Sequence, residues 1–281
     1  MNDHFLDTLL SFCQNHPAID AVILTSTRVR NLTIDALSDY DIEIYTSNPE
    51  IFITSDTWMQ FYDQPMFRFN DQFIQHDIEL YMRMVIYEDY TKVDYKIIPT
   101  ELLEKLSNTY DPDLDNDYQV LIDKGRFTEN LLEATHQSYY IKAPEKRQFD
   151  DMIGSFFMEC SYIAKNLWRQ QLMEAKYSFA FMRFEKLLPM LEWYLAAKSN
   201  TPLKHFKHGR NIEQYLSKTE IEQLNATYAA ANYEENWQAL YAAIELFAYA
   251  ARKLNYQYPE KLHQKAMKYF TDIQNMERDR T

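Results

Sequence analysis

The sequence predicts an α+β fold, with a mixed-sheet domain in residues 1–143 and an α-helical domain in residues 144–281. Three observations predict it. Short apolar or alternating segments, typical of strands, occur before residue 100. After Pro144, apolar residues recur at spacings of three and four, which is typical of helices that bury one face. Only 3 of the 281 residues are glycine, which favours a largely helical chain with few turns of positive φ.

The predicted sheet domain begins with a helix and continues with strands. Phe5, Leu9 and Cys13 recur at helical spacing, and a His-Pro pair at residues 16–17 ends this helix. We expect strands, in chain order, at residues 21–25, 42–45, 77–87 and 92–98. The short segment between the last two strands indicates a hairpin, so part of the sheet is expected to be antiparallel.

Helices are expected from residue 100 onward, after Pro99 closes the last strand. The predicted helices, in chain order, cover residues 100–106, 117–124, a long stretch after Pro144, and about 177–199, 212–228, 234–254 and 259–275. No strand is predicted after Pro99. The second domain is therefore interpreted as a bundle of helices.

Composition excludes several classes of protein. Apolar residues make up 46% of the chain, enough for a substantial core, but no apolar run is long enough to span a membrane. The N-terminus lacks the pattern of a secretion signal. The two cysteines, Cys13 and Cys160, have no pair spacing, so neither a disulfide scaffold nor a thiolate metal site is expected. We therefore expect a cytoplasmic protein without a membrane partner.

Charge is uneven along the chain. The net charge is −13, and residues 1–100 hold 16 acidic and 6 basic residues. An acidic protein repels a phosphate backbone, so a nucleic-acid partner is disfavoured. Acidic surfaces attract cationic partners, although solubility alone is the alternative explanation. The three glycines, at positions 125, 154 and 209, are too widely spaced to form a glycine-rich phosphate loop.

Three aspartates form the most informative pattern in the sequence. Asp39 and Asp41 lie two residues apart at the start of a predicted strand, so both face the same side. Neighbouring carboxylates repel unless a cation lies between them, and a hard divalent cation prefers oxygen ligands. Asp94, on the strand of residues 92–98, is costly to bury without a partner. An isolated Asp-x-Asp is most often a surface or turn feature. The preceding strand, the turn of residues 26–28 and the later Asp94 favour a metal site.

Four segments carry a closer resemblance. They are residues 38–42 (Ser-Asp-Tyr-Asp-Ile), 92–99, 120–124 and 140–151. In this order they resemble the aminoglycoside 6-adenylyltransferases, the streptomycin-modifying members of the nucleotidyltransferase superfamily, and the similarity covers essentially the whole chain. The resemblance implies a nucleotidyltransferase domain similar to that of DNA polymerase beta, followed by a helical substrate-binding domain.

The resemblance also implies an activity and a set of site residues. The family transfers AMP from ATP, with Mg²⁺ as cofactor, to a hydroxyl of an aminoglycoside such as streptomycin, which confers antibiotic resistance. Asp39, Asp41 and Asp94 would ligate magnesium and carry the catalysis, and Asp94 could help to activate the hydroxyl. The implied nucleotide-binding residues are Ser26, Thr27, Arg28, Lys207 and Arg210. The implied substrate-binding residues are Asp150 and Asp151.

Each of these binding residues also has a structural interpretation. Arg28 could form a surface salt bridge. Lys207 and Arg210 could be solvated charges at the start of a helix. Asp150 and Asp151 open a helix, where carboxylates interact favourably with the helix dipole.

Three departures from the family pattern keep a second hypothesis open. Ser26 stands where the family has a glycine that lets the backbone approach a phosphate. Gly154 and Ser155 replace an Asn-Glu pair, and Tyr177 falls at the position of an aspartate. The alternative is therefore a weakened or inactive member that binds nucleotide or another ligand. Transfer to a protein or to RNA is a third hypothesis, which the negative charge disfavours.

Overall fold

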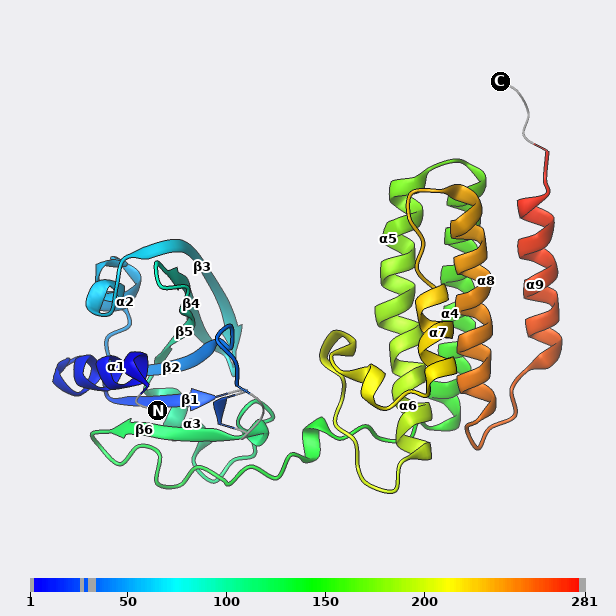
Figure 1. The fold of residues 1–281 in the computed structure, drawn as a ribbon. Coiled ribbons are helices and arrows are strands. Elements are labelled where there is room, and N and C mark those ends of the chain that lie inside the picture. The colour runs from blue at the N-terminus through cyan, green and yellow to red at the C-terminus, as the bar shows by residue number, and fades with distance from the viewer. Residues whose placement is uncertain (1–2, 26–27, 30–33, 278–281) are drawn as a thin grey trace. The chain divides into compact units, whose positions relative to one another are not determined.

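The computed structural model describes residues 3–25, 28–29 and 34–277 and divides into two compact units, Met1–Tyr139 and Tyr140–Thr281 (Figure 1). The predicted boundary after residue 143 lies four residues away from this division. The first unit carries a six-stranded sheet, whereas the second is built from helices. The predicted α+β fold class is confirmed.

The sheet has the order β3-β4-β5-β2-β1-β6, and its central pair, β2 and β5, is parallel. All other neighbours are antiparallel, including the predicted β4–β5 hairpin. The strands are β1 Ala21–Thr25, β2 Tyr40–Thr46, β3 Pro65–Gln75, β4 Ile78–Tyr87, β5 Lys92–Pro99 and β6 Tyr118–Asp123. The helices of this unit are α1 His4–Asn15, α2 Glu50–Ile53 and α3 Glu101–Leu106.

The two faces of the sheet differ in composition. One face is apolar along its length and packs against Phe5, Leu9 and Cys13 of α1, which are the residues that predict this helix. The other face is apolar only at one end, where leucines of α3 cover it. At its other end this face carries the charged residues of β2 and β5, namely Asp41, Glu43, Lys92, Asp94 and Lys96. These charged residues form a polar patch at one end of this face.

Two strands depart from the sequence prediction. β3 was not predicted. It is an edge strand whose residues are largely exposed, so it lacks the alternation of buried apolar and exposed polar residues that indicates a strand. The predicted helix at residues 117–124 is wrong, since these residues form β6, the opposite edge strand, paired with β1. In a run of six residues, helical and extended spacing are hard to distinguish, and Val120 and Ile122 favour the strand.

The low glycine content does not mean few left-handed turns. Ten described non-glycine residues have positive φ, and seven of them are Asn, Asp or His. These side chains tolerate the left-handed region better than other residues do. His76 and Asp77, with φ of 51° and 59°, form the tight turn between β3 and β4.

The second unit is a helical bundle with one core. Its helices are α4 Lys146–Trp168, α5 Leu172–Met182, α6 Leu188–Lys198, α7 Lys218–Ala226, α8 Tyr233–Arg252 and α9 Glu260–Gln274. The rings of Phe156 and Phe247 stack with centroids 3.7 Å apart and join α4 to α8. The predicted helix at 177–199 is two helices joined by a π-helical turn, Arg183–Leu187. The predicted helix at 212–228 is shorter, because only α7 is regular.

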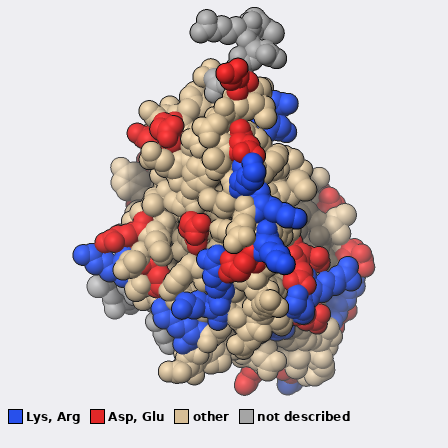
Figure 2. Space-filling model, turned by 90° about the vertical axis from the view of Figure 1, so that its right-hand side faces the viewer, with Lys and Arg blue, Asp and Glu red and all other residues tan. Residues whose placement is uncertain are grey.

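Surface charge is mixed on the face drawn in Figure 2, where Lys and Arg side chains lie among Asp and Glu side chains. The helical unit also carries ion pairs at helix positions four apart, such as Lys268 with Asp272 on α9. Within the described ranges, every helix is too short or too polar to cross a membrane. Cys13 and Cys160 are buried and free.

Candidate functional site

The predicted aspartates meet where β2 and β5 run side by side. In this parallel pair Asp41 lies opposite Asp94, and Glu43 lies opposite Lys96. Because alternate residues of a strand face the same side, these four side chains form two neighbouring rungs on one face of the sheet. Asp39 directly precedes β2. The structure thus brings Asp39, Asp41 and Asp94 to one end of this face.

Lys92 lies among these carboxylates. Its Nζ atom is 2.6 Å from Oδ2 of Asp39 and 3.0 Å from Oδ2 of Asp94. Burial disfavours the charged ammonium, but hydrogen bonds to Asp39 and Asp94 and their charges outweigh it, so the pKa of Lys92 is raised. Sequence reasoning assigned Lys92 no role. The available signal was its position two residues before Asp94, which puts both side chains on one face.

The carboxylates fit magnesium chemically, although they are not gathered around one point. Within residues 3–25, 28–29 and 34–277, no three His, Cys, Asp or Glu side chains are close enough together to hold a metal ion. Lys92 bridges Asp39 and Asp94 instead. Oδ1 of Asp94 is buried and has no hydrogen-bond partner, so it remains available as a ligand. Carboxylate oxygens are the ligands that Mg²⁺ prefers.

The next rung is a closed ion pair. Nζ of Lys96 lies 3.1 Å from Oε1 of Glu43, and the hydroxyl of Tyr45 donates to Oε2 at 2.9 Å. Glu43 is only 5% exposed. Burial disfavours the charged form of Lys96, but the Glu43 carboxylate outweighs it and raises the pKa of Lys96. Both charges are therefore satisfied beside Asp41 and Asp94.

Arg28 holds the chain that leads into the site. Its guanidinium donates to the backbone oxygens of Ser38 and Asp39 at 2.7 and 3.0 Å. It also lies 3.5 Å from the ring centroid of Tyr40 and 3.6 Å from the Asp3 carboxylate. These contacts position Asp39. Arg28 thus forms a salt bridge, as one interpretation expected, but most of its contacts hold the backbone before β2. Its predicted contact with a phosphate stays a prediction. The predicted phosphate-binding Ser26 and Thr27 lie outside the described residues.

The remaining predicted residues lie in the helical unit. Lys207 and Arg210 are exposed, and their side chains make no hydrogen bond or ion pair with any described residue. Asp150 and Asp151 are exposed on the first turns of α4, where Asp150 pairs with Lys146 and Asp151 lies 3.6 Å from Arg147. Their role in binding nucleotide or substrate stays a prediction.

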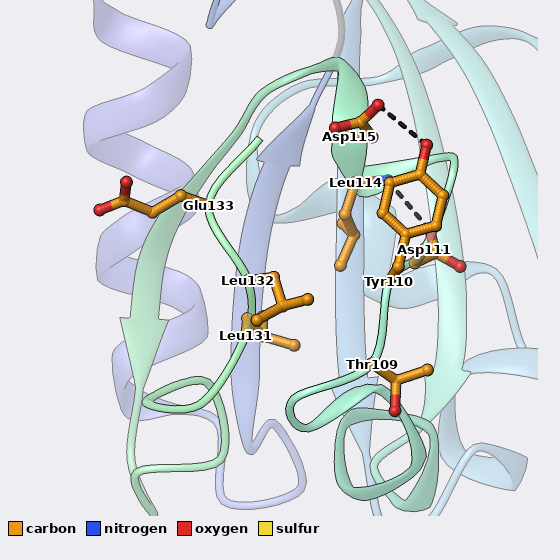
Figure 3. Close-up of a pocket in the computed structure, with 8 residues that line it drawn as sticks. All are labelled: Thr109, Tyr110, Asp111, Leu114, Asp115, Leu131, Leu132 and Glu133. Carbon is orange, nitrogen blue, oxygen red and sulfur yellow. Dashed lines mark hydrogen bonds between the residues drawn. The ribbon is translucent and has the colours of Figure 1, made fainter. Parts of the chain in front are cut away.

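The sheet unit also contains a small hollow beside η3, Leu114–Asn116 (Figure 3). Its volume is about 10 Å³, roughly the space that one water molecule needs. Asp115 accepts hydrogen bonds from the backbone and hydroxyl groups of Thr135 and Ser138, and from the hydroxyl of Tyr110 at 3.0 Å. Although burial opposes it, these bonds hold the pKa of Asp115 well below its usual range. Asp115 therefore anchors the loop that contains Thr135 and Ser138. The hollow beside it is too small for a substrate.

Comparisons with known proteins test the resemblance to the aminoglycoside 6-adenylyltransferases. A model of the streptomycin adenylyltransferase family matches residues 1–273. The chain is 28% identical over 268 residues to the aminoglycoside 6-adenylyltransferase of Bacillus subtilis (strain 168), covering 91% of this chain and 92% of the relative. It is 25% identical over 267 residues to the Staphylococcus aureus protein of the same name, covering 90% and 92%. The crystal structure of an aminoglycoside 6-adenyltransferase from Bacillus subtilis aligns at 24% identity with a TM-score of 0.47, covering 98% of this chain and 100% of that one.

The family match and the two named relatives confirm the resemblance carried by the sequence segments. The family match spans both the sheet unit and the helical unit, so it concerns the whole architecture. The matched relatives are named as adenylyltransferases, which are nucleotidyltransferase enzymes. The chain therefore belongs to the streptomycin adenylyltransferase family, a family of nucleotidyltransferase enzymes.

Proposed function

We propose that this chain is a magnesium-dependent enzyme that transfers AMP from ATP to a hydroxyl of an aminoglycoside, with streptomycin as the first acceptor to test. The observation that carries the proposal is the register of β2 and β5, which sets Asp41 opposite Asp94 with Asp39 beside them. Family membership supports the same chemistry. In a host cell this reaction would inactivate the antibiotic.

The proposed roles follow from the carboxylates. Asp39, Asp41 and Asp94 would hold the magnesium, which neutralises phosphate charge during in-line displacement when it is bound. The acceptor hydroxyl oxygen forms a bond to the α-phosphorus while the bond from that phosphorus to pyrophosphate breaks. The hydroxyl proton passes to the carboxylate of Asp94, which lies opposite Asp41 in the register of β2 and β5. Arg28 keeps Asp39 in position through the two backbone oxygens that it binds.

The acidic composition of the sheet unit supports a cationic acceptor, and the enzyme is proposed to act in the cytoplasm. Residues 1–100 hold 16 acidic and 6 basic residues, which favours an amine-rich substrate over a nucleic acid. Asp150 and Asp151 remain the proposed contacts to the acceptor, since both are exposed. Lys207 and Arg210 remain proposed contacts to the nucleotide phosphates, because their side chains have no partner among the described residues.

The second candidate function is nucleotide binding without catalysis: the chain would bind ATP but would not transfer AMP. Two observations favour this alternative. The Lys92 ammonium lies between Asp39 and Asp94, where it competes with a metal cation. Tyr177, at the position of a family aspartate, is 73% exposed and adds no charge for an amine-rich acceptor.

The test measures pyrophosphate release with Mg-ATP and a panel of aminoglycosides led by streptomycin. Mass spectrometry of the drug checks for one added AMP and locates the modified hydroxyl. Asp41→Asn should lower the rate by about a thousandfold, because a magnesium ligand is lost. Asp71→Asn, on the exposed strand β3, removes the same charge outside the site and should leave the rate unchanged.

Binding of Mg-ATP by calorimetry separates the two functions. Drug-dependent release that requires Asp41 establishes the transferase. Tight nucleotide binding without release for any drug in the panel supports the binding protein and rejects the transferase. Equal rates for Asp41→Asn and the unchanged chain would show that the chemistry lies elsewhere.

A further inference from the structure

The helical unit contains a cavity that the proposed transfer reaction does not use. Its volume is about 310 Å³, at the lower end of the range for small-molecule sites. It lies between α5, the π-helical turn that follows it, and the start of α8. The residues that line it are Lys176, Phe179, Arg183, Thr227, Tyr228, Ala229 and Asn236.

Two of the lining residues are cations without an acidic partner. The Arg183 guanidinium donates to the backbone oxygen of Thr227 at 2.7 Å and lies 3.9 Å from the ring centroid of Tyr228. Nζ of Lys176 donates to the backbone oxygen of Ala229 at 2.6 Å. In the described part of the chain, neither cation forms an ion pair with a carboxylate within 4.0 Å.

The surroundings of these two cations disfavour their charge. Burial lowers the pKa of Arg183, and burial together with the neighbouring Arg183 charge lowers the pKa of Lys176, although the Glu235 carboxylate acts in the opposite direction on Lys176. The chain has a net charge of −13, so carboxylates are abundant elsewhere. Two adjacent, partly buried cations in such a chain form a site whose charge an anion would balance.

Two polar atoms of the lining residues also lack partners. Nε of Arg183 and Oδ1 of Asn236 are buried and have no hydrogen bond, and Asn236 is fully buried. Burying a polar group without a hydrogen bond is unfavourable. One atom is a donor and the other an acceptor. A ligand that carries both anionic oxygens and an O–H group would satisfy both.

The backbone at this place is irregular as well. Arg183 begins the π-helical turn Arg183–Leu187, between the regular helices α5 and α6. Single π-helical turns inside helices are frequent at functional sites. The irregular turn adds a residue to the helix next to the cavity and so changes the direction of the following side chains.

We propose that this cavity binds a small phosphate-bearing anion. Hydrogen phosphate supplies anionic oxygens for Lys176 and Arg183 and an O–H group that can donate to Asn236. A sugar phosphate offers the same two functions through its phosphate oxygens and its sugar hydroxyls. A carboxylate at neutral pH has no such donor. The site is distinct from that of the proposed transfer reaction, because none of the residues proposed for that reaction lines the cavity.

Calorimetric titration of the intact chain without magnesium tests the proposal. The probes are inorganic phosphate, a sugar phosphate as an example of a monoester, and malonate as a dicarboxylate, at constant ionic strength. Arg183→Gln and Lys176→Gln should each weaken phosphate binding at least about tenfold. Lys186→Gln is the matched control, because it removes a charge three residues from Arg183 but does not line the cavity.

Asn236→Asp is the substitute variant if Arg183→Gln fails to fold. It keeps the size of the side chain and places a negative charge at the cavity, so it should also weaken phosphate binding. Stronger binding of the sugar phosphate than of inorganic phosphate would identify a phosphorylated metabolite as the ligand class, and the reverse would identify free phosphate. The proposal is overturned if phosphate does not bind, if malonate binds equally well, or if the cavity variants bind phosphate as the unchanged chain does.

Discussion

The β2–β5 site and the α5 cavity treat their cations in opposite ways. In the β2–β5 site, the lysines of β5 pair with carboxylates on or just before β2, as Lys92 does with Asp39 and Lys96 with Glu43. In the helical unit, Arg183 and Lys176 donate only to backbone oxygens. The comparison teaches that net charge alone does not locate a binding site. What matters is whether each buried charge already has a partner inside the protein.

The largest effect is expected from removing a cation whose partner is deeply buried. Lys96→Met leaves Glu43, which is 5% exposed, without its counter-charge. Breaking a buried pair in this way costs about 3–5 kcal/mol of the free energy of unfolding. Urea denaturation followed by tryptophan fluorescence measures the loss. A change below about 1 kcal/mol would contradict the view that this pair is a closed structural unit.

The helical unit has a buried carboxylate of its own, satisfied mainly by hydroxyl and backbone donors. Glu220 accepts from Tyr194, from Tyr249 at 3.2 Å and from the backbone of Ser217 at 2.6 Å. Although burial opposes the shift, the hydrogen bonds from Tyr194 and Ser217, together with the charge of Lys198, lower the pKa of Glu220 from 4.5 to about 2. The difference corresponds to about 3 kcal/mol of stability for the ionised form.

Glu220→Gln should therefore lower the free energy of unfolding by about 3 kcal/mol near neutral pH. Because the folded pKa is depressed, this stabilisation is fully present above the unfolded pKa of 4.5 and is lost as the pH falls toward about 2. The two proteins should converge over that interval in denaturation curves measured at several pH values. A difference that stays constant down to pH 2 would contradict the assignment.

A smaller effect is expected at the mouth of the candidate site. Lys92 is about one-third exposed, so Lys92→Met should cost only about 1 kcal/mol of stability. The variant removes the ammonium that competes for Asp39 and Asp94. Magnesium should then raise the melting temperature of the variant more than that of the unchanged chain. Equal magnesium effects would show that Lys92 does not compete for the metal site.

The smallest effect on stability is expected at the exposed pairs of α4. Asp150→Asn and Asp151→Asn remove partners of Lys146 and Arg147, and each should change the free energy of unfolding by less than about 0.5 kcal/mol. If these residues bind the acceptor, KM for the aminoglycoside should rise while kcat changes little. An unchanged KM would leave them with a purely local role at the start of the helix.

Much of the fold follows from the spacing of apolar residues. The helix of residues 4–15 and the strands around Asp41 and Asp94 were predictable because each buries a face of regular period. β3 was not predictable, since an exposed edge strand buries little that could set a pattern. β6 was assigned wrongly because tertiary pairing with β1, and not local spacing, decides its conformation.

The candidate site was predictable in its carboxylates but not in its cations. The order of Asp39, Asp41 and Asp94 along predicted strands is a local signal that sequence carries. The bridge from Lys92 to Asp39 spans 53 residues and depends on the parallel pairing of β2 and β5. The cavity around Arg183 depends in the same way on residues 44 positions apart. Such contacts become visible only when the topology is known.

The turns built from Asn, Asp and His instead of glycine affect the unfolded chain as much as the folded one. Ten described residues other than glycine have positive φ. With only 3 glycines, the unfolded chain has fewer accessible backbone conformations than it would have with glycine at each of those ten positions. Less conformational entropy is therefore lost at each of these turns on folding. The accompanying backbone strain is modest for Asn211 and Asn108, whose side chains suit the left-handed region. Replacing either by glycine would relieve that strain while enlarging the unfolded ensemble, so the two contributions to stability oppose each other at these turns.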